Sequence, residues 1–273
     1  MIRERRFVES ILEEDIGRGD LFALCVTPTP ATAHIIAKED GVLAGLVYAK
    51  ELEEIADITI EFKHQDSASI QKGDLIAVVS GTQTRLLSIE RTLLNMMQHA
   101  SGIATNARAY SALLDGSGIK ILDTRKTRPL LREFEKYAAR MGGVVNHRLG
   151  LDDCLMLKDT HLKTIKEIPA FIAHARTKIP FTSKIEMECE TLDQVKIALE
   201  SGVDIIMCDN MDIKTIKAAS MLRDEISPSV LLEASGNITT QTVKSYIGSG
   251  IDALSSGSIV HQATWLDFSM KMQ

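Results

Sequence analysis

A cluster of basic side chains stands out in a chain that is acidic overall. The segment from residue 123 to residue 148 has seven Lys and Arg residues and three Asp and Glu residues, a surplus of four, whereas the whole chain has 31 basic and 37 acidic residues. Three of the seven, Arg132, Lys136 and Arg140, recur at every fourth position, which is typical of the solvated face of a helix. We expect these three to face solvent.

Four other basic residues of this segment lie where neither helix formation nor solubility requires them. Arg125 and Lys126 follow a short apolar run, and His147 and Arg148 come shortly after the pair Gly142-Gly143. Planar guanidinium groups bind carboxylates and phosphates through two parallel hydrogen bonds. We therefore expect a ligand with more than one negative charge at these residues.

Acidic residues that could bind a metal lie at the ends of two apolar runs. Lys184, Glu186 and Glu188 alternate with apolar residues, so they share one side of a strand. Lys184 and Glu186 either pair with each other inside the protein or have a functional role, and the pattern does not separate these hypotheses. Glu188 could hold a divalent cation together with Asp209, because Mg²⁺ takes one or two carboxylates, substrate oxygens and waters. The seven histidines show no HxH or HExxH spacing, and we expect most of them to be structural.

Small residues end two further apolar runs. Ser235-Gly236-Asn237 and Ser255-Ser256-Gly257 leave backbone N–H groups uncovered, and a phosphate group can approach such groups closely. We expect a phosphorylated ligand at these two positions.

The second half of the chain predicts the strands and helices that position these residues. Short runs rich in Ile, Leu and Val alternate with helical patterns at Leu192–Glu200, Ile213–Leu222 and Thr239–Ile247, which predicts a parallel α/β sheet or barrel. Six strands are expected rather than the eight of a closed barrel, so the fold class is α/β with an incomplete or open (β/α) barrel. The expected strands are Lys120–Asp123, Cys154–Lys158, Lys184–Glu188, Ile205–Asp209, Val230–Ser235 and Ala253–Ser256.

The first hundred residues predict a smaller α+β domain. A helix near Arg5–Glu14 precedes strand-like segments at Ala31–Glu39, Ile58–Lys63 and Leu75–Ser80. A long helical pattern follows from Arg85, and we expect Ser101-Gly102 to interrupt it before it resumes at Thr105–Leu114. We place the N-terminal domain at residues 1–104 and the barrel domain at residues 105–261, with the tail, residues 262–273, packed on the first domain.

Composition excludes several classes of protein. A net charge of −6 (31 − 37) gives no general positive field for nucleic acid, and no run of 18 uncharged apolar residues predicts a membrane span. The four cysteines form no CxxC pair and lie in apolar stretches, as buried thiols do in a reducing compartment. We expect a cytoplasmic protein without a targeting segment, a nucleic-acid partner or a membrane partner.

Several of these segments together resemble one enzyme family. The motifs, which extend over nearly the whole chain, are similar to those of the quinolinate phosphoribosyltransferases, a type II phosphoribosyltransferase family. They are Glu90-Arg91-Thr92-Leu93-Leu94-Asn95, Ser101-Gly102-Ile103-Ala104-Thr105, Asp123-Thr124-Arg125-Lys126-Thr127-Arg128-Pro129, Asn146-His147-Arg148-Leu149-Gly150-Leu151, Leu157-Lys158-Asp159, Glu186-Met187-Glu188, Cys208-Asp209-Asn210 and Glu233-Ala234-Ser235-Gly236-Asn237. The resemblance implies transfer of phosphoribosyl from phosphoribosyl pyrophosphate to quinolinate with loss of CO₂, which gives nicotinate mononucleotide and pyrophosphate in NAD biosynthesis, with Mg²⁺ as cofactor.

The resemblance also implies roles for individual residues. Lys126, Lys158, Glu188 and Asp209 would be catalytic, the last two as carboxylates that face the ribose hydroxyls and the metal. Arg91 would reach the neighbouring subunit's site, which implies a homodimer and leaves assembly beyond the dimer open. The full set of expected substrate-binding residues is Arg91, Thr124, Arg125, Lys126, His147, Arg148, Lys158, Glu188, Asp209, Ser235, Gly236, Asn237, Ser256, Gly257 and His261.

Three alternatives stay open at the level of sequence. Pyrophosphorylase-like proteins associated with molybdenum transport share the fold and several motifs. A barrel lyase could use Lys158 or Lys184 to form a Schiff base with its substrate. A non-catalytic sensor of a phosphorylated ligand is the third alternative, although it would not require Glu188 and Asp209 opposite a cluster of arginines.

Overall fold

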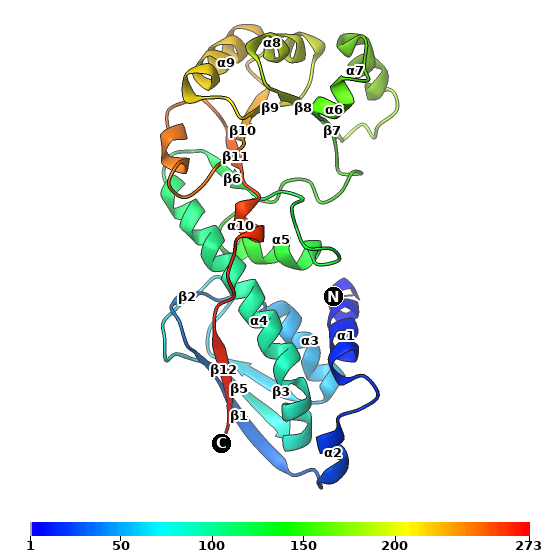
Figure 1. Cartoon of the computed structure of the whole chain (residues 1–273), viewed down its shortest axis with the longest axis vertical. Helices are drawn as coiled ribbons and strands as arrows, with labels where there is room; N and C mark the ends of the chain where they lie inside the picture. Colours follow the sequence, from blue (N-terminus) through cyan, green and yellow to red (C-terminus); the bar gives the residue numbers. More distant parts are fainter. Residues whose placement is uncertain (1) are drawn as a thin grey trace. The chain divides into compact units, whose positions relative to one another are not determined.

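The protein is described by a computed structural model that covers residues 2–273. The chain forms two compact units. The first contains the described residues up to 108 together with residues 137–143 and 263–273, and the second contains Ala109–Lys136 and Val144–Gln262. Figure 1 shows the chain coloured along its length.

The first unit is built around an antiparallel sheet in the order β12-β1-β5-β3. Side chains of β1 alternate between buried and partly exposed positions, as expected for a strand with one face on a core. The C-terminal strand β12 pairs with β1 over five residues, so the two lie side by side in Figure 1 (red and blue). The strands of this unit are β1 (Pro30–Ala37), β2 (Gly41–Val42), β3 (Thr59–Phe62), β4 (Ser69–Ile70), β5 (Leu75–Thr82) and β12 (Phe268–Met272), and its first helices are α1 (Ile2–Ile16), α2 (Leu21–Cys25) and α3 (Leu46–Ala56).

Helix α4 (Gln83–Ser111) runs without interruption through the expected break at Ser101-Gly102, so that prediction is wrong. Gly102 is there for a close approach: a Cβ atom at this position would collide with the carbonyl oxygen of Thr264. The Ser101 hydroxyl accepts from the Ala44 N–H at 3.0 Å and donates to the Ala44 carbonyl at 3.1 Å. Both residues therefore serve packing, and the surrounding contacts outweigh the low helix propensity of glycine.

The second unit contains a parallel sheet in the order β6-β11-β10-β9-β8-β7. Within the described residues, no ladder joins β6 to β7, so the two outer strands leave the barrel open, and the predicted fold class is confirmed. Because the strands are parallel, their carboxyl ends lie at one edge: Ser235 aligns with Asp209 on one side and Ser255 on the other. The strands are β6 (Lys120–Leu122), β7 (Cys154–Leu157), β8 (Lys184–Cys189), β9 (Ile205–Asp209), β10 (Leu231–Ser235) and β11 (Ala253–Ser255).

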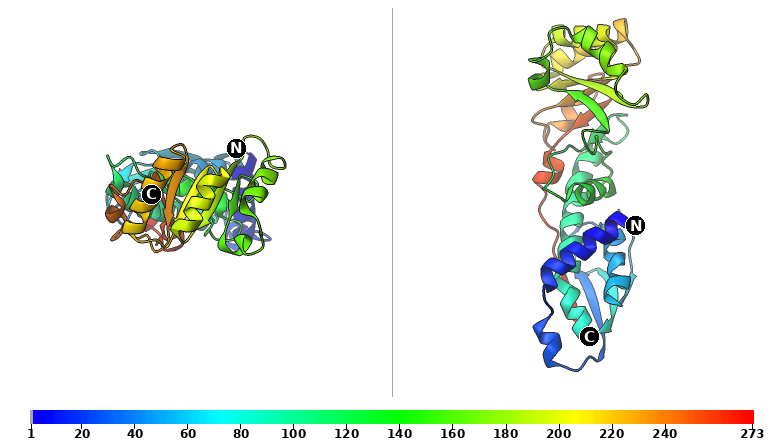
Figure 2. Two further views of the ribbon diagram at one scale, coloured as in Figure 1. Left: turned by 90° about the horizontal axis from the view of Figure 1, so that it is seen from above. Right: turned by 90° about the vertical axis from the view of Figure 1, so that its right-hand side faces the viewer.

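Helices α7 (Ile168–Arg176), α8 (Leu192–Ser201) and α9 (Ile213–Ile226) cover one face of this sheet (Figures 1 and 2). Helix α8 begins with a capping box between Thr191 and Gln194 and ends at Gly202, whose φ of 76° suits a glycine C-cap. The remaining helical segments are α5 (Arg132–Met141), α6 (Asp159–Leu162), α10 (Ser258–His261) and the short 3₁₀ turns η1 (Ala112–Leu114) and η2 (Val243–Tyr246).

The helix expected over Thr239–Ile247 is only the 3₁₀ turn η2, so its predicted length is wrong. The Thr242 hydroxyl accepts from the Thr239 N–H at 3.0 Å and lies 3.4 Å from the Asn237 carbonyl. Such local bonds from threonine side chains compete with the first turn of an α-helix, which explains the shorter element.

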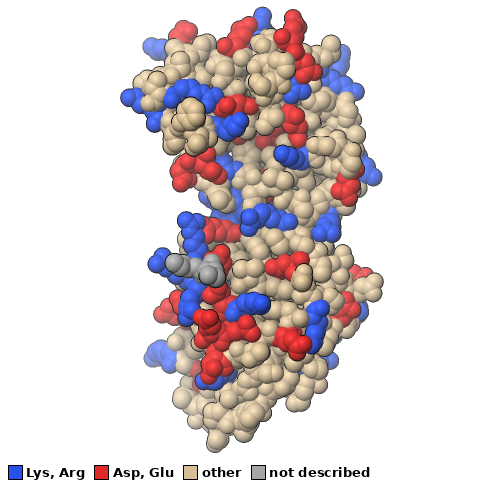
Figure 3. All heavy atoms as spheres, turned by 180° about the vertical axis from the view of Figure 1, so that it is seen from behind, with Lys and Arg blue, Asp and Glu red and all other residues tan. Residues whose placement is uncertain are grey.

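The chain's surface charges are mixed. Figure 3 shows Lys and Arg side chains interspersed with Asp and Glu side chains over most of the face drawn, with a small group of acidic side chains in its lower half. No helix in residues 2–273 is both long enough and apolar enough to cross a membrane.

Candidate active site

A cavity of about 840 Å³ lies at the carboxyl ends of the strands in the second unit. It is bounded by residues from β7 through β11 and by the segments that follow β6, as expected for a parallel α/β site. All the expected substrate-binding residues except Arg91 line it: Thr124, Arg125, Lys126, His147, Arg148, Lys158, Glu188, Asp209, Ser235, Gly236, Asn237, Ser256, Gly257 and His261.

Three cationic side chains line the cavity without an acidic partner. Within residues 2–273, none of Arg125, Lys126 and Arg148 forms an ion pair, and the Nε atom of Arg125 is buried with no hydrogen-bond partner. Arg148 is 9% exposed, and its guanidinium donates to the Cys154 carbonyl at 2.9 Å. Burial and the neighbouring Arg125 both lower the pKa of Arg148. Like charges held together in this way suit a ligand with several negative charges.

Acidic side chains lie at the ends of two neighbouring strands of the same cavity. Glu188, the penultimate residue of β8, accepts a hydrogen bond from Lys158 Nζ at 2.9 Å, so within residues 2–273 Lys158 is ion-paired, unlike Arg125, Lys126 and Arg148. Asp209 ends β9, and its carboxylate accepts from the Asn210 amide at 2.8 Å. Burial and the nearby Glu188 raise the pKa of Asp209. A divalent cation would relieve this repulsion between carboxylates, and oxygen donors suit Mg²⁺.

Two glycines allow a ligand to approach the backbone beyond β10 and β11. Gly236 has a φ of +99°, which L-residues rarely adopt, and a Cβ atom there would collide with Asn210 Oδ1. A Cβ atom at Gly257 would lie 2.6 Å from Lys126 Cδ, so the lysine stem lies directly against this glycine. The Ser256 hydroxyl donates to the Ile238 carbonyl at 2.8 Å. It is therefore the backbone of this segment, more than the serine hydroxyl, that is available to a phosphate.

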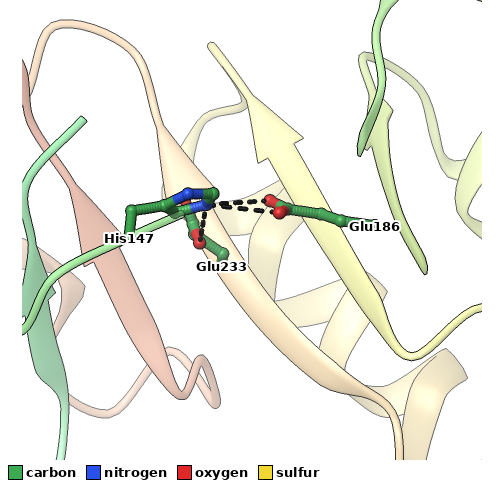
Figure 4. A group of neighbouring side chains, drawn as sticks. All are labelled: His147, Glu186 and Glu233. Carbon is green, nitrogen blue, oxygen red and sulfur yellow. Dashed lines mark hydrogen bonds and ion pairs between the residues drawn. The ribbon is translucent and has the colours of Figure 1, made fainter. Parts of the chain in front are cut away.

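His147 lies between two buried carboxylates from different strands (Figure 4). Its Nε2 atom is 3.2 Å from Glu186 Oε2 on β8 and 3.3 Å from Glu233 Oε2 on β10. Glu186 was expected to pair with Lys184 or to be functional, but Lys184 is exposed, so the pairing hypothesis is wrong. Lys184 is the first residue of β8 and points into solvent, whereas Glu186, two residues further along the same face, is buried in the interior.

The three groups share a proton. Burial lowers the pKa of His147, but hydrogen bonds to Glu186 and Glu233 raise it overall to about 10. Burial and the neighbouring Glu186 likewise raise the pKa of Glu233. These two shifts describe one shared proton. Because His147 Nδ1 accepts the Arg148 N–H at 2.8 Å, Nε2 is the ring nitrogen that can donate to the two carboxylates.

A second buried network holds the main chain of the same segment. Asp123, at the end of β6, accepts from the His147 N–H at 2.8 Å and from the Asn146 amide at 2.6 Å. Lys136 forms an ion pair with Asp123 and donates to the His147 carbonyl at 2.8 Å. Lys136 is 1% exposed, so the prediction that it faces solvent is wrong. Four-residue spacing shows only that side chains share a face of a helix. Lys136 lies on the part of that face that packs against the buried Asp123, and it is therefore internal.

Arg91 is the one expected residue outside this cavity. It lies on α4 in the first unit and is exposed. Several apolar and polar lining residues carry no distinctive spacing and were not predicted. They are Met156, Met207, Asn210, Ile238, Thr239, Ser258 and Gln262. Asn210, which follows Asp209 directly and has a φ of 53°, was the one with a local signal, because asparagine tolerates this conformation.

Family comparisons agree with this geometry. The family model described as "Quinolinate phosphoribosyl transferase, C-terminal domain" matches residues 103–271, and the corresponding N-terminal domain model matches residues 20–101. The chain belongs to the quinolinate phosphoribosyltransferase family. The family resemblance inferred from the motifs is therefore confirmed.

Individual relatives extend over the same length. A protein from Mycobacterium leprae named nicotinate-nucleotide pyrophosphorylase (carboxylating) is 34% identical over 275 residues, 98% of this chain and 96% of its own. A probable nicotinate-nucleotide pyrophosphorylase (carboxylating) from Synechocystis is 36% identical over 269 residues, 97% of this chain and 91% of its own. The crystal structure of NadC from Streptococcus pyogenes superposes with a TM-score of 0.94 at 39% identity, covering 100% of this chain and 97% of that one. Family and fold thus agree across both units.

Proposed function

We propose that this chain is a quinolinate phosphoribosyltransferase: quinolinate and phosphoribosyl pyrophosphate give nicotinate mononucleotide, pyrophosphate and CO₂. The observation that carries the proposal is one cavity lined both by Arg125, Lys126 and Arg148, which form no ion pair within residues 2–273, and by the acids Glu188 and Asp209. The cations suit a ring acid with two carboxylates, and the acids suit the ribose and its metal-bound pyrophosphate. The named relatives support the same reaction.

The binding roles follow from the positions of the charges. Arg125 and Arg148 hold the two quinolinate carboxylates, and Lys126 and Lys158 bind either these carboxylates or the pyrophosphate. Lys158 must then exchange its bond to Glu188 for a bond to substrate. The 5′-phosphate lies on the backbone of the segments around Gly236 and Gly257, with Thr124, Ser235, Asn237, Ser256 and His261 at its edges.

Glu188 and Asp209 are the residues that would hold Mg²⁺. Their carboxylates lie near the ends of neighbouring strands, and burial together with the nearby Glu188 raises the pKa of Asp209, so a hard cation placed between them would be favoured. When bound, Mg²⁺ supplies positive charge that makes pyrophosphate a better leaving group.

The chain's own residues act by position and charge. As the bond from the anomeric carbon to pyrophosphate breaks, the carboxylates of Glu188 and Asp209 stabilise positive charge on the ribose. The arginines orient quinolinate so that its ring nitrogen forms the new bond to that carbon. The resulting pyridinium accepts the electron pair released when CO₂ leaves the adjacent carbon, which then takes up a proton. This step needs no further organic cofactor.

The Schiff-base alternative has less support. Lys184 is exposed at the opposite end of β8, and Lys158 Nζ bonds Glu188 at 2.9 Å. A lysine that forms a Schiff base must bring its nitrogen to the carbonyl carbon of the substrate, whereas the nitrogen of Lys158 is engaged with this carboxylate.

We further propose a homodimer located in the cytoplasm. Arg91 is exposed on α4, where it is free to reach a neighbouring subunit, and the apolar side chains of Leu21 and Leu24 on α2 are 76% and 80% exposed. Exposed leucines on one short helix suit contact with a second copy of the chain. The four cysteines are all free thiols, which fits a reducing compartment.

One assay tests the activity. The purified protein is incubated with quinolinate, phosphoribosyl pyrophosphate and Mg²⁺, and CO₂ and nicotinate mononucleotide are measured together. We expect equal amounts of the two products from quinolinate. When nicotinate replaces quinolinate, we expect no CO₂. Turnover that releases no CO₂ would contradict the proposed reaction. Tight binding of the substrates without turnover would contradict it as well and would favour the sensor alternative.

A further inference from the structure

The main chain of His147 is fixed from both sides by buried charges. Asp123 accepts its N–H at 2.8 Å, and Lys136 donates to its carbonyl oxygen at 2.8 Å. The side chains of Asp123 and Lys136 are 0% and 1% exposed. Neither hydrogen bond, however, determines where the imidazole ring points, because both involve only backbone atoms of His147.

The ring is held by a second pair of buried groups. Glu186 on β8 and Glu233 on β10 lie 3.2 and 3.3 Å from Nε2, and both carboxylates are at most 2% exposed (Figure 4). In Figure 4 both carboxylates lie on the Nε2 side of the ring and come from two different strands. Because Nε2 contacts both of them, the ring cannot rotate without breaking at least one of these contacts.

The other ring nitrogen of His147, Nδ1, connects the two glutamates to Arg148, the expected ligand-binding residue that follows His147 in the chain. Nδ1 accepts the Arg148 N–H at 2.8 Å, so rotation of the ring would also release the backbone of Arg148. We propose that Glu186 and Glu233 are positioning residues, which fix the ring of the preceding histidine and thereby the direction of Arg148 in the cavity. The inference rests on the proposed function, because Arg148 is expected to bind a quinolinate carboxylate.

Stability alone does not account for these two carboxylates. Glu186 Oε2 and Glu233 Oε1 are buried without a hydrogen bond of acceptable geometry, and leaving such groups unsatisfied is unfavourable. Replacing buried ionic groups by apolar residues often leaves stability unchanged or raises it. A role in fixing the cavity gives a physical reason for acidic residues at these positions.

Glu186 also acts on Arg148 electrostatically. It favours the charged form of Arg148 and thereby opposes the effects of burial and of Arg125. Two guanidinium groups can then lie near each other before an anionic ligand arrives. Neither Glu186 nor Glu233 is among the residues that line the cavity, so we expect both to affect binding through the residues they hold.

The test uses the isosteric variants Glu186→Gln and Glu233→Gln in the full chain. Each keeps the shape of the side chain and removes its charge. We expect the KM for quinolinate to rise about tenfold, which corresponds to a loss of roughly 1.4 kcal/mol in binding free energy. The KM for phosphoribosyl pyrophosphate should stay unchanged. Glu225→Gln, which changes an exposed acid on α9, is the matched control and should leave both constants unchanged.

A spectroscopic readout separates positioning from general damage. With ¹⁵N-labelled imidazole, the wild-type His147 should show a protonated Nε2 and an unprotonated, hydrogen-bonded Nδ1. In Glu233→Gln the two nitrogen shifts should move toward each other, because a ring that is no longer fixed exchanges between its two tautomers. If Glu233→Gln does not fold, Glu233→Met, which fills the same space without a buried polar group, should give the same rise in quinolinate KM.

Each outcome decides the proposal. If the wild-type enzyme forms nicotinate mononucleotide but both glutamine variants keep the wild-type quinolinate KM, the positioning role is refuted and the proposed function stands. If the wild-type enzyme has no activity with quinolinate, the proposed function fails instead. The ligand atoms of His147, Glu186 and Glu233 all lie within 4.8 Å of one another, so dialysis against Mn²⁺ is included. Tight Mn²⁺ binding that Glu233→Gln abolishes would replace the positioning role by a metal site.

Discussion

The ammonium group of Lys136 forms an ion pair with the carboxylate of Asp123 inside the second unit, where both side chains are almost completely buried. Burial raises the pKa of Asp123 and lowers that of Lys136, and their mutual attraction opposes both shifts. The pair therefore stays charged only while both partners are present. It joins β6, α5 and the segment that carries His147 and Arg148.

Removing one partner of this pair should destabilise the protein strongly. For Lys136→Met we expect a loss of about 3–5 kcal/mol in the free energy of unfolding, because Asp123 would be left as an uncompensated buried charge. Arg140→Met, one helical turn further along α5, should change stability by no more than about 0.5 kcal/mol because Arg140 is exposed. Urea denaturation of the three proteins measures both values. Equal stability of the two variants would refute the importance of the buried pair.

Arg148→Ala should affect one substrate more than the other. We expect the KM for quinolinate to rise by about 10- to 100-fold, since an ionic hydrogen bond contributes about 1.5–3 kcal/mol, whereas the KM for phosphoribosyl pyrophosphate should change little. Steady-state kinetics with each substrate varied in turn gives the two constants. Arg176→Ala, on α7 outside the cavity, is a control that should change neither. An unchanged quinolinate KM in Arg148→Ala would remove this residue from the binding site.

The two carboxylates at the ends of β8 and β9 should determine the dependence on Mg²⁺. For Glu188→Gln and Asp209→Asn we expect kcat to fall on the order of 100-fold, the size of effect seen when a group that stabilises transition-state charge is removed. The Mg²⁺ concentration needed for half-maximal activity should rise in both variants. Titration of Mg²⁺ in the product assay measures these quantities. Activity of the wild-type enzyme that persists unchanged in EDTA would contradict the assigned metal site.

The stability contributed by His147 should depend on pH in a defined direction. In the folded protein the pKa of His147, which describes the proton that it shares with Glu186 and Glu233, is raised to about 10 by these two carboxylates against the effect of burial, whereas the value of unfolded histidine is about 6.5. The contribution is therefore complete below pH 6.5 and is lost as the pH rises toward 10. We expect the difference in unfolding free energy between wild type and His147→Gln to shrink over this range. The exposed His174→Gln should show no such trend.

A single methyl group at Gly102 should disturb the C-terminal tail. The added Cβ would collide with the Thr264 carbonyl, so Gly102→Ala should destabilise the protein by about 1–3 kcal/mol despite the better helix propensity of alanine. Amide hydrogen exchange in β12 should become faster, because this strand follows the displaced segment. Slower exchange or higher stability would mean that the tail moves aside at no cost.

Much of the fold could be predicted from local patterns. The six parallel strands appear within one or two residues of their expected positions, because each is a short apolar run bounded by polar or small residues. The cavity collects fourteen of fifteen expected residues, since parallel strands place their carboxyl ends at one edge. Motif similarity supplied the family, and both family models confirm it.

Tertiary structure alone decided which charges are buried and which groups they meet. Lys136 has the same helical spacing as the more exposed Arg132 and Arg140, yet it lies against Asp123. Glu186 pairs with His147, which is 39 residues away in the chain, and not with Lys184 two residues away. Periodicity records which side chains share a face of one element. The partner across the interior depends on how distant segments pack, and that has no local pattern in the sequence.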